Sequence, residues 1–192
     1  MKRNLKIPKP IKQESLSFLT TLIATLIGVF MAIYLTDQGV RKKEKDDSTK
    51  LLNTINVITK QNIEHVNRME RFKSLVKDST GKKSLEFNKS NPLPSTELLK
   101  SILSNDVVSK YLSEYSHSQA YSILLSADRE INLNFSDAYK KRLSEFLYLI
   151  SYELEYQKGI INSDLMLEKF KAKRDSIYNF TKMLDSANIS KN

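Results

Sequence analysis

The pattern of hydrophobic and polar residues divides the chain into two parts. Twenty residues from Leu16 to Leu35 carry no charge, and their few polar side chains are Ser17 and threonines. Twenty helical residues span about 30 Å, which is the thickness of a bilayer's hydrocarbon core. Tyr34 lies near the end of this run, where aromatic rings favour the headgroup layer. We therefore predict a transmembrane helix over residues 15–36.

A cleaved signal peptide is the main alternative for this apolar run. Its apolar region would cover roughly 7–15 residues and would be followed by an A-x-A-like cleavage site. The run found here is longer, and the sequence IYLTD at residues 33–37 offers no such site. The pattern favours an uncleaved membrane anchor.

Small residues recur at every fourth position of the predicted span, at Thr20, Ala24, Gly28 and Ala32. Residues spaced by four lie on one face of a helix. In lipid, helices associate through close backbone approach, which rows of small residues permit. Gly and Ala are also frequent in membrane helices for no such reason. We interpret the row as a packing face and predict a homo-oligomer.

The second part, residues 51–190, has the apolar periodicity of amphipathic helices. Proline occurs only at residues 8, 10, 92 and 94, and long proline-free segments favour helix over strand. We predict an all-α protein in which the span precedes a bundle of about five amphipathic helices. The positions expected to face its core include Leu51, Ile55, Ile58, Val66, Met69, Leu98, Leu99, Val108, Tyr121, Leu124, Leu125, Tyr139, Leu143, Phe146, Ile150, Leu154, Met166, Phe170, Phe180 and Leu184.

Capping and turn residues predict where these helices begin and end. A long helix is expected over about 48–77, possibly continuous with the span, followed by a loop over 78–95. Later boundaries are a cap at Ser95 or Thr96, a break at Asn105–Asp106, a helix over about 118–131, a cap at Asp137, an end at Gly159 and a start at Asn162 or Ser163.

Composition narrows the chemistry that the chain can perform. The absence of cysteine excludes disulfides, thiolate metal sites and a cysteine nucleophile. The net charge of +9 attracts anionic lipid, nucleic acid or acidic partners.

Basic residues flank the predicted span on both sides. The tail at 1–14 and the charged segment at 37–50 each contain five, so the positive-inside rule leaves the side of the soluble domain undetermined. We predict that the membrane-surface contacts come from Lys2, Arg3, Lys6, Lys9, Lys12, Arg41, Lys42, Lys43 and Lys45.

Candidate catalytic and metal motifs are incomplete. Glu114 and His117 have the spacing of a di-iron half-site, but the other histidine, His65, has Asn62 in the carboxylate position. The segment STGKKS at 79–84 lacks the first glycine of a phosphate-binding loop and its Ser or Thr directly after lysine. The basic points Lys140–Arg142 and Lys171–Arg174 have acidic residues nearby, at Glu145, Glu168 and Asp175. We expect no catalytic residue, no cofactor, no metal and no nucleic-acid partner.

Three segments carry a resemblance: GVFMAIYLTDQGVRKKEK, STKLLNTINVITKQNIEHV and AYSILLSADREINLNFSDAYKKRLSEFLYLI. In them the chain resembles a loose group of uncharacterised bacterial proteins with one amino-terminal span, a basic exit and a helical domain. The resemblance implies this architecture and a single-pass location in the bacterial plasma (inner) membrane. It implies no activity.

Two functional hypotheses follow. The first is a non-catalytic, self-associating scaffold or sensor that contacts the lipid bilayer and possibly another membrane or soluble protein. The second is a membrane-perturbing effector of the host-defence type, triggered by a ligand or partner, which requires a cytoplasmic bundle.

Overall fold

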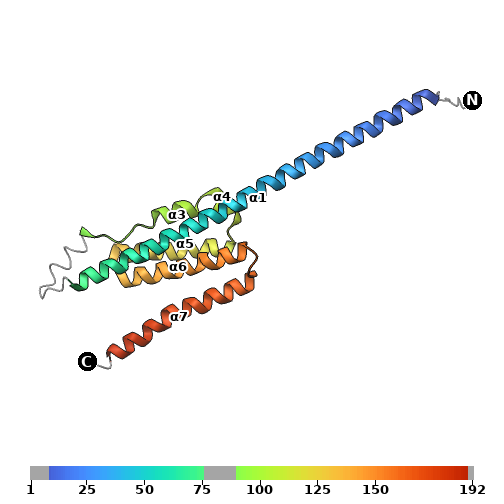
Figure 1. Cartoon of the computed structure of the whole chain (residues 1–192). Coiled ribbons are helices and arrows are strands. Elements are labelled where there is room, and N and C mark those ends of the chain that lie inside the picture. The colour runs from blue at the N-terminus through green and yellow to red at the C-terminus, as the bar shows by residue number, and fades with distance from the viewer. Residues whose placement is uncertain (1–8, 76–89, 190–192) are drawn as a thin grey trace, which may run out of the picture. The chain divides into compact units, whose positions relative to one another are not determined.

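The computed structural model describes residues 9–75 and 90–189 of the chain, with side chains at 17–73 and 90–179. These residues are helical, with no strand among them, which confirms the all-α prediction for the described part of the chain. The helices, labelled as in Figure 1, are α1 (Lys9–Leu75), α3 (Glu97–Leu103), α4 (Asp106–Tyr111), α5 (Glu114–Leu133), α6 (Ser136–Gln157) and α7 (Ser163–Ile189).

The chain forms two compact units, Met1–Glu44 (unit 1) and Lys45–Asn192 (unit 2). Helix α1 supplies the described part of unit 1 and continues into unit 2. The helix expected at 48–77 is therefore continuous with the predicted span, and the charged segment at 37–50 is helical. No proline occurs between Ile11 and Asn91, so no ring interrupts the hydrogen bonds of this long helix.

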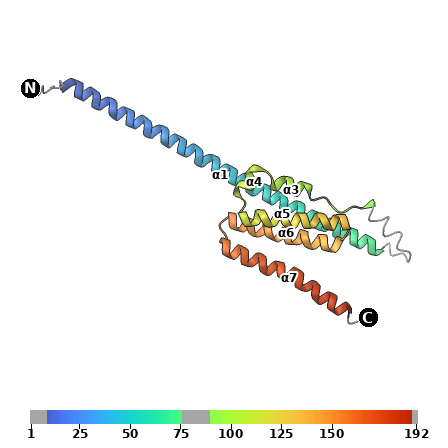
Figure 2. The same ribbon diagram turned by 180° about the vertical axis from the view of Figure 1, so that it is seen from behind.

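Unit 2 is built around α6, which lies beside α5 in both views (Figures 1 and 2). The second part of α1 runs antiparallel to α6, because Asn56 bonds to Ser151 at 3.2 Å and Glu70 pairs with Lys140 at 2.6 Å. Side chains from α1, α3, α5, α6 and α7 share one apolar core. Its fully or almost fully buried members include Leu52, Ile55, Val66, Leu99, Leu103, Leu124, Tyr139, Leu143, Phe146, Ile150 and Phe170.

The stripe predicted on α6 is confirmed, since Tyr139, Leu143, Phe146, Ile150 and Leu154 are all buried. Two positions expected to face inward are exposed instead, Leu98 at 57% and Leu125 at 58%. In both cases the adjacent leucine, Leu99 or Leu124, takes the core position. A pair of adjacent leucines does not reveal which one faces the core, because both fit the helical period.

Left-handed residues end two of the long helices. Asn134 (φ 57°) follows α5, and Gly159 (φ 71°) follows α6, as predicted. In both turns a backbone N–H returns to a carbonyl five residues earlier, from Phe135 to Glu130 and from Ile160 to Glu155, each at 2.9 Å. These bonds form the Schellman motif, which satisfies carbonyls that a helix end leaves unpaired.

Several predicted helix starts are confirmed. Asn105 accepts a bond from the Val107 N–H at 3.0 Å, and Asn162 accepts one from the Leu165 N–H at 2.8 Å. At the start of α3, Ser95 Oγ accepts from the Glu97 N–H at 3.2 Å. The Thr96 hydroxyl donates instead to Asp128 on α5.

Two predicted starts are wrong. Helix α6 begins at Ser136 with no side-chain cap, so Asp137 lies inside its first turn, where a carboxylate still favours the positive end of the helix dipole. Helix α5 begins at Glu114 rather than near Ser118, because Ser113 Oγ accepts from the Ser116 N–H at 3.2 Å.

The predicted loop at 78–95 lies mostly outside the described residues. The last part of this loop packs against the helices of unit 2. Leu93 is buried, and the Tyr139 hydroxyl donates to the Pro94 carbonyl at 2.7 Å. Burial, reinforced by the nearby Asp128 charge, raises the pKa of Tyr139. The hydroxyl is therefore held as a neutral donor between α6 and the segment before α3.

We expect Gly159→Ala to lower the free energy of unfolding by about 1 kcal/mol, because a side chain disfavours the left-handed conformation. A Cβ at this position meets no atom within 4 Å, so the cost is conformational rather than steric. Denaturant unfolding of the full-length protein in detergent, followed by circular dichroism, measures it. Asn134→Gly is the matched control and should unfold at the parent's midpoint or slightly above it; equal midpoints for Gly159→Ala and the parent would contradict the expectation.

Candidate functional site

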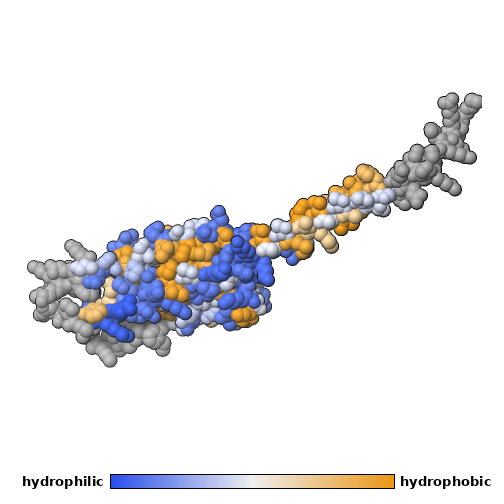
Figure 3. Space-filling view, turned by 45° about the horizontal axis from the view of Figure 1, so that its top comes forward, coloured by the Kyte–Doolittle hydropathy of each residue, from blue (hydrophilic) through white to orange (hydrophobic). Residues whose placement is uncertain are grey.

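The side chains in the apolar segment of α1 are not buried by other described residues of the chain. Every large apolar residue from Phe18 to Leu35 is between 45% and 71% exposed. Figure 3 shows these hydrophobic residues along the visible face of unit 1. Of the described helices, this is the one long and apolar enough to cross a membrane, with a mean hydropathy of 2.2 over its most apolar 18 residues and none of them buried. A helix that is apolar on all sides needs an apolar surrounding.

The threonines of this segment satisfy their hydroxyls within the helix. Thr20 and Thr21 both donate to the Ser17 carbonyl, at 2.8 and 2.9 Å. Thr25 donates to Thr21 and Thr36 to Ala32, each at 2.8 Å. A hydroxyl in hydrocarbon has no water to bond, so back-bonding to the helix lowers the cost of placing it there.

The predicted packing residues Thr20, Ala24, Gly28 and Ala32 all lie on the exposed surface of α1. A Cβ added at Gly28 would meet nothing within 4 Å. No contact within the described part of this chain therefore accounts for the small residues. The face is open to a second helix.

Four of the predicted membrane-surface residues have described side chains, namely Arg41, Lys42, Lys43 and Lys45, and all four are exposed. Arg41 pairs with Asp37 one turn earlier at 2.9 Å. Lys9 and Lys12 lie in α1 without described side chains, and Lys2, Arg3 and Lys6 lie outside the described residues.

Unit 2 contains a buried carboxylate that the sequence analysis missed. Glu153 is fully buried on α6. Its oxygens accept from the Ser113 N–H at 3.1 Å, the Ser113 and Ser116 hydroxyls at 2.7 Å each, and the Gln157 amide at 3.1 Å. No cation pairs with it in the part of the chain that the structure describes.

The amino terminus of α5 takes the place of that cation. Ser113 is the residue that caps α5, and the first turn of a helix carries a partial positive charge and free N–H groups. Glu153 therefore links the middle of the bundle to the start of α5. A signal for it was present in the sequence, since Glu153 and Gln157 continue the helical spacing of Phe146 and Ile150.

A second buried carboxylate joins α6 to α7. Glu145 Oε2 accepts from the Tyr178 hydroxyl at 2.8 Å and from Arg142 at 3.3 Å, and Arg142 also bonds to Tyr178. Burial, and then the bond to Glu145, raises the pKa of Tyr178 to about 12. The phenol thus stays protonated and donates at any physiological pH.

Three of the basic residues considered for nucleic-acid binding, Lys140, Arg142 and Lys173, have partners within unit 2. Lys140 pairs with Glu70, and Arg142 with Glu145. The Lys173 ammonium lies 4.7 Å from the centre of the Tyr148 ring, a cation–π distance. Their charges contribute to the packing of α1, α6 and α7.

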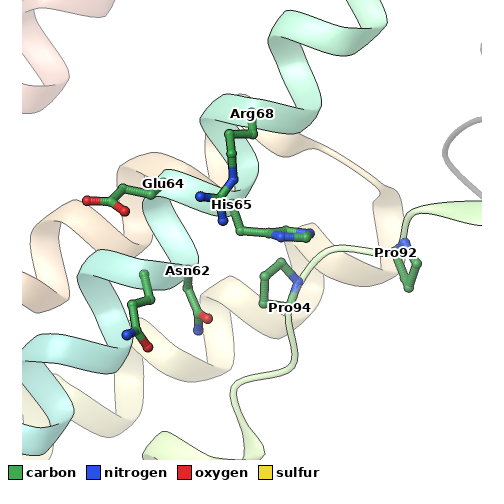
Figure 4. A pocket seen from close by; sticks show the side chains of 7 residues that line it. Asn62, Glu64, His65, Arg68, Pro92 and Pro94 are labelled. Carbon is green, nitrogen blue, oxygen red and sulfur yellow. The ribbon is translucent and has the colours of Figure 1, made fainter.

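An open groove of about 600 Å³ lies between α1 and the segment before α3, and Figure 4 shows the side chains that line it. His65 points towards Pro92 and Pro94 in this groove, whereas Glu64 points away from them. The lining residues are Gln61, Asn62, Glu64, His65, Arg68, Pro92 and Pro94. Among these described residues there is no Ser, Thr or Cys.

The other histidine, His117, packs its ring against Tyr121 on α5 with 5.0 Å between centroids. Over the described residues, no three His, Asp or Glu side chains lie close enough together to hold a metal ion.

Comparison with models of known protein families, with curated proteins and with solved structures gives no match for this chain. The resemblance to bacterial single-span proteins stays a prediction.

We expect Glu153→Ala to lower the free energy of unfolding by about 2–5 kcal/mol, because it leaves several buried donors without an acceptor and opens a cavity. Glu153→Gln, which keeps the shape but turns a donor towards the Ser113 and Ser116 donors, should cost about 1–3 kcal/mol.

Chemical denaturation of the full-length protein in detergent gives both values. Glu168→Ala, at an exposed position of α7, is the matched control and should stay within about 0.5 kcal/mol of the parent. Equal losses for Glu153→Ala and Glu168→Ala would show that the buried network adds nothing.

Proposed function

We propose that this protein is a single-pass membrane protein of the bacterial plasma membrane, which self-associates through its span and serves as a non-catalytic scaffold or sensor. Residues 15–36 form the span, and unit 2 is a bundle of amphipathic helices. Its partners are the lipid bilayer and further copies of the chain, with another membrane or soluble protein as a further candidate.

One observation carries the membrane location. The helix is uncharged over twenty residues, exposed on all faces and internally bonded at its threonines. Removing these side chains from water is worth roughly 25 cal/mol per Å² of apolar surface. The described part of the chain offers them no core, and a bilayer offers one of matching thickness.

The small-residue face supports self-association. A single span can pack only on another copy or on a different membrane protein. The open space around Gly28 means that no close contact within the described chain explains a glycine at this position. Close approach of a second, identical helix gives it one.

The structure of unit 2 supports a binding role over a catalytic one. Its buried carboxylates, Glu145 and Glu153, each bond to several donors that hold neighbouring helices together. Carboxylates engaged in this way stabilise the packing of the helices. The exposed surface of unit 2 is then the part of the molecule available for partners.

The full-length protein is expected to sediment with membranes, to resist an alkaline carbonate wash and to dissolve in detergent. Replacing Ile27 and Phe30 together by arginine should release it to the soluble fraction, since each arginine at the centre of a span costs about 2.5–3.5 kcal/mol. Val57→Arg, at an exposed site of unit 2, should leave the distribution unchanged. An intact parent protein in the supernatant without detergent would disprove the proposal.

Gly28→Ile is expected to weaken self-association at least several-fold in a membrane two-hybrid assay, because isoleucine prevents close backbone approach. Phe30→Ile places the same side chain about 160° around the helix and should have no effect. Since isoleucine at 28 meets little within its own chain, a loss would report an intermolecular contact. Equal signals for both variants and the parent would contradict a helix interface at this face.

A further inference from the structure

We propose that the turn between α6 and α7 is a second lipid-contact site, which touches the surface of the bilayer that residues 15–36 cross. This inference depends on the proposed function, because it requires residues 15–36 to cross a bilayer. It adds a contact made by unit 2 itself.

The composition of the turn suits the boundary between water and lipid. Ile160 is 67% exposed at its tip, directly after Gly159. Tyr156 and Leu165 are partly exposed on either side, and Lys158 is exposed beside them. An aliphatic tip, a tyrosine and a lysine are the side chains that favour the headgroup region, since each combines apolar surface with a group that tolerates water or phosphate.

The position of the turn identifies the lipid surface as its partner. Tyr156, Lys158 and Gly159 line an open cavity of about 480 Å³ together with Lys45 of α1. Both overall views place the α6–α7 turn at this end of unit 2 (Figures 1 and 2). Lys45 follows Thr36, the last residue of the predicted span, by nine residues. Nine residues reach at most about 30 Å however the chain is arranged, so chain length alone keeps Lys45 and its cavity within that distance of the end of the predicted span.

The two lysines of this cavity complement lipid phosphates. Asp46 and Asp164 lie nearby in the sequence. Their negative charges offset the positive charges of the two lysines at this end of unit 2. The apolar tip is therefore the main contact, and Lys45 and Lys158 add attraction to anionic headgroups.

The opposite end of unit 2 provides a matched comparison. Leu133, just before the α5–α6 turn, is 60% exposed, nearly as much as Ile160. The 22 residues of α6 separate the two turns, a length of about 33 Å. If exposure alone decided which residues contact lipid, Ile160 and Leu133 would do so equally. A lipid-contact site at the α6–α7 turn predicts more contact at Ile160 than at Leu133.

The absence of cysteine allows each site to be labelled separately. Ile160→Cys, Leu133→Cys and Phe30→Cys variants of the full-length protein each receive a nitrobenzoxadiazole dye. The proteins are placed in vesicles of phosphatidylcholine and phosphatidylglycerol, and quenching by lipids with a spin label near the headgroup or deep in the chain is measured. Circular dichroism confirms that each labelled protein is folded.

We expect strong quenching at residue 30 by the deep label, and several-fold more quenching by the shallow label at residue 160 than at residue 133. Quenching at residue 30 with equal values at 160 and 133 would overturn this inference and leave the proposed function standing. No quenching at residue 30 would overturn the proposed function and, with it, this inference.

Discussion

The structure depends on one constraint, which is that the apolar segment of α1 has no protein surface to cover it in the described chain. Hydrophobic side chains must leave water somewhere, and in unit 2 they do so among five helices around α6. From Phe18 to Leu35 they remain exposed on every side of one helix. The same physical rule therefore gives unit 2 a protein core, and it is the reason for proposing lipid as the surroundings of the apolar segment of α1.

Within unit 2, polar contacts decide how the helices align. The apolar stripes of α5, α6 and α7 could slide by a turn and still bury leucines. Moving Glu153 by one turn would take its carboxylate about 5.4 Å from the Ser113 and Ser116 donors, and would leave both sides buried and unbonded. The Glu145–Tyr178 pair imposes the same restriction on α7. These few bonds select one register among several that hydrophobicity alone would accept.

Sequence reasoning succeeded where one residue has one physical explanation. Proline-free amphipathic segments predicted helices, Gly159 predicted an end, and the α6 stripe predicted five buried positions, all of which the structure has. It failed where neighbours compete. Leu124 and Leu125 both fit the period, and Asp137 resembles a cap although the chain starts the helix at Ser136. The Glu153 site was missed because charged residues are expected at the surface, and its partners on α5 are forty residues away. The helical spacing of Glu153 places it on the core face of α6, but a single sequence does not show which donors on another helix it meets.

The two tight left-handed turns have a consequence for how unit 2 assembles. Helices α5, α6 and α7 follow one another through turns of a few residues, so their contacts form between near neighbours in the chain. Local contacts need little loop-closure entropy and form early. The bond from Asn56 to Ser151 joins residues 95 positions apart. During synthesis, α1 is therefore complete long before α5, α6 and α7, the helices with which it shares the core of unit 2. The core residues of α1 in unit 2 stay uncovered until those helices have folded.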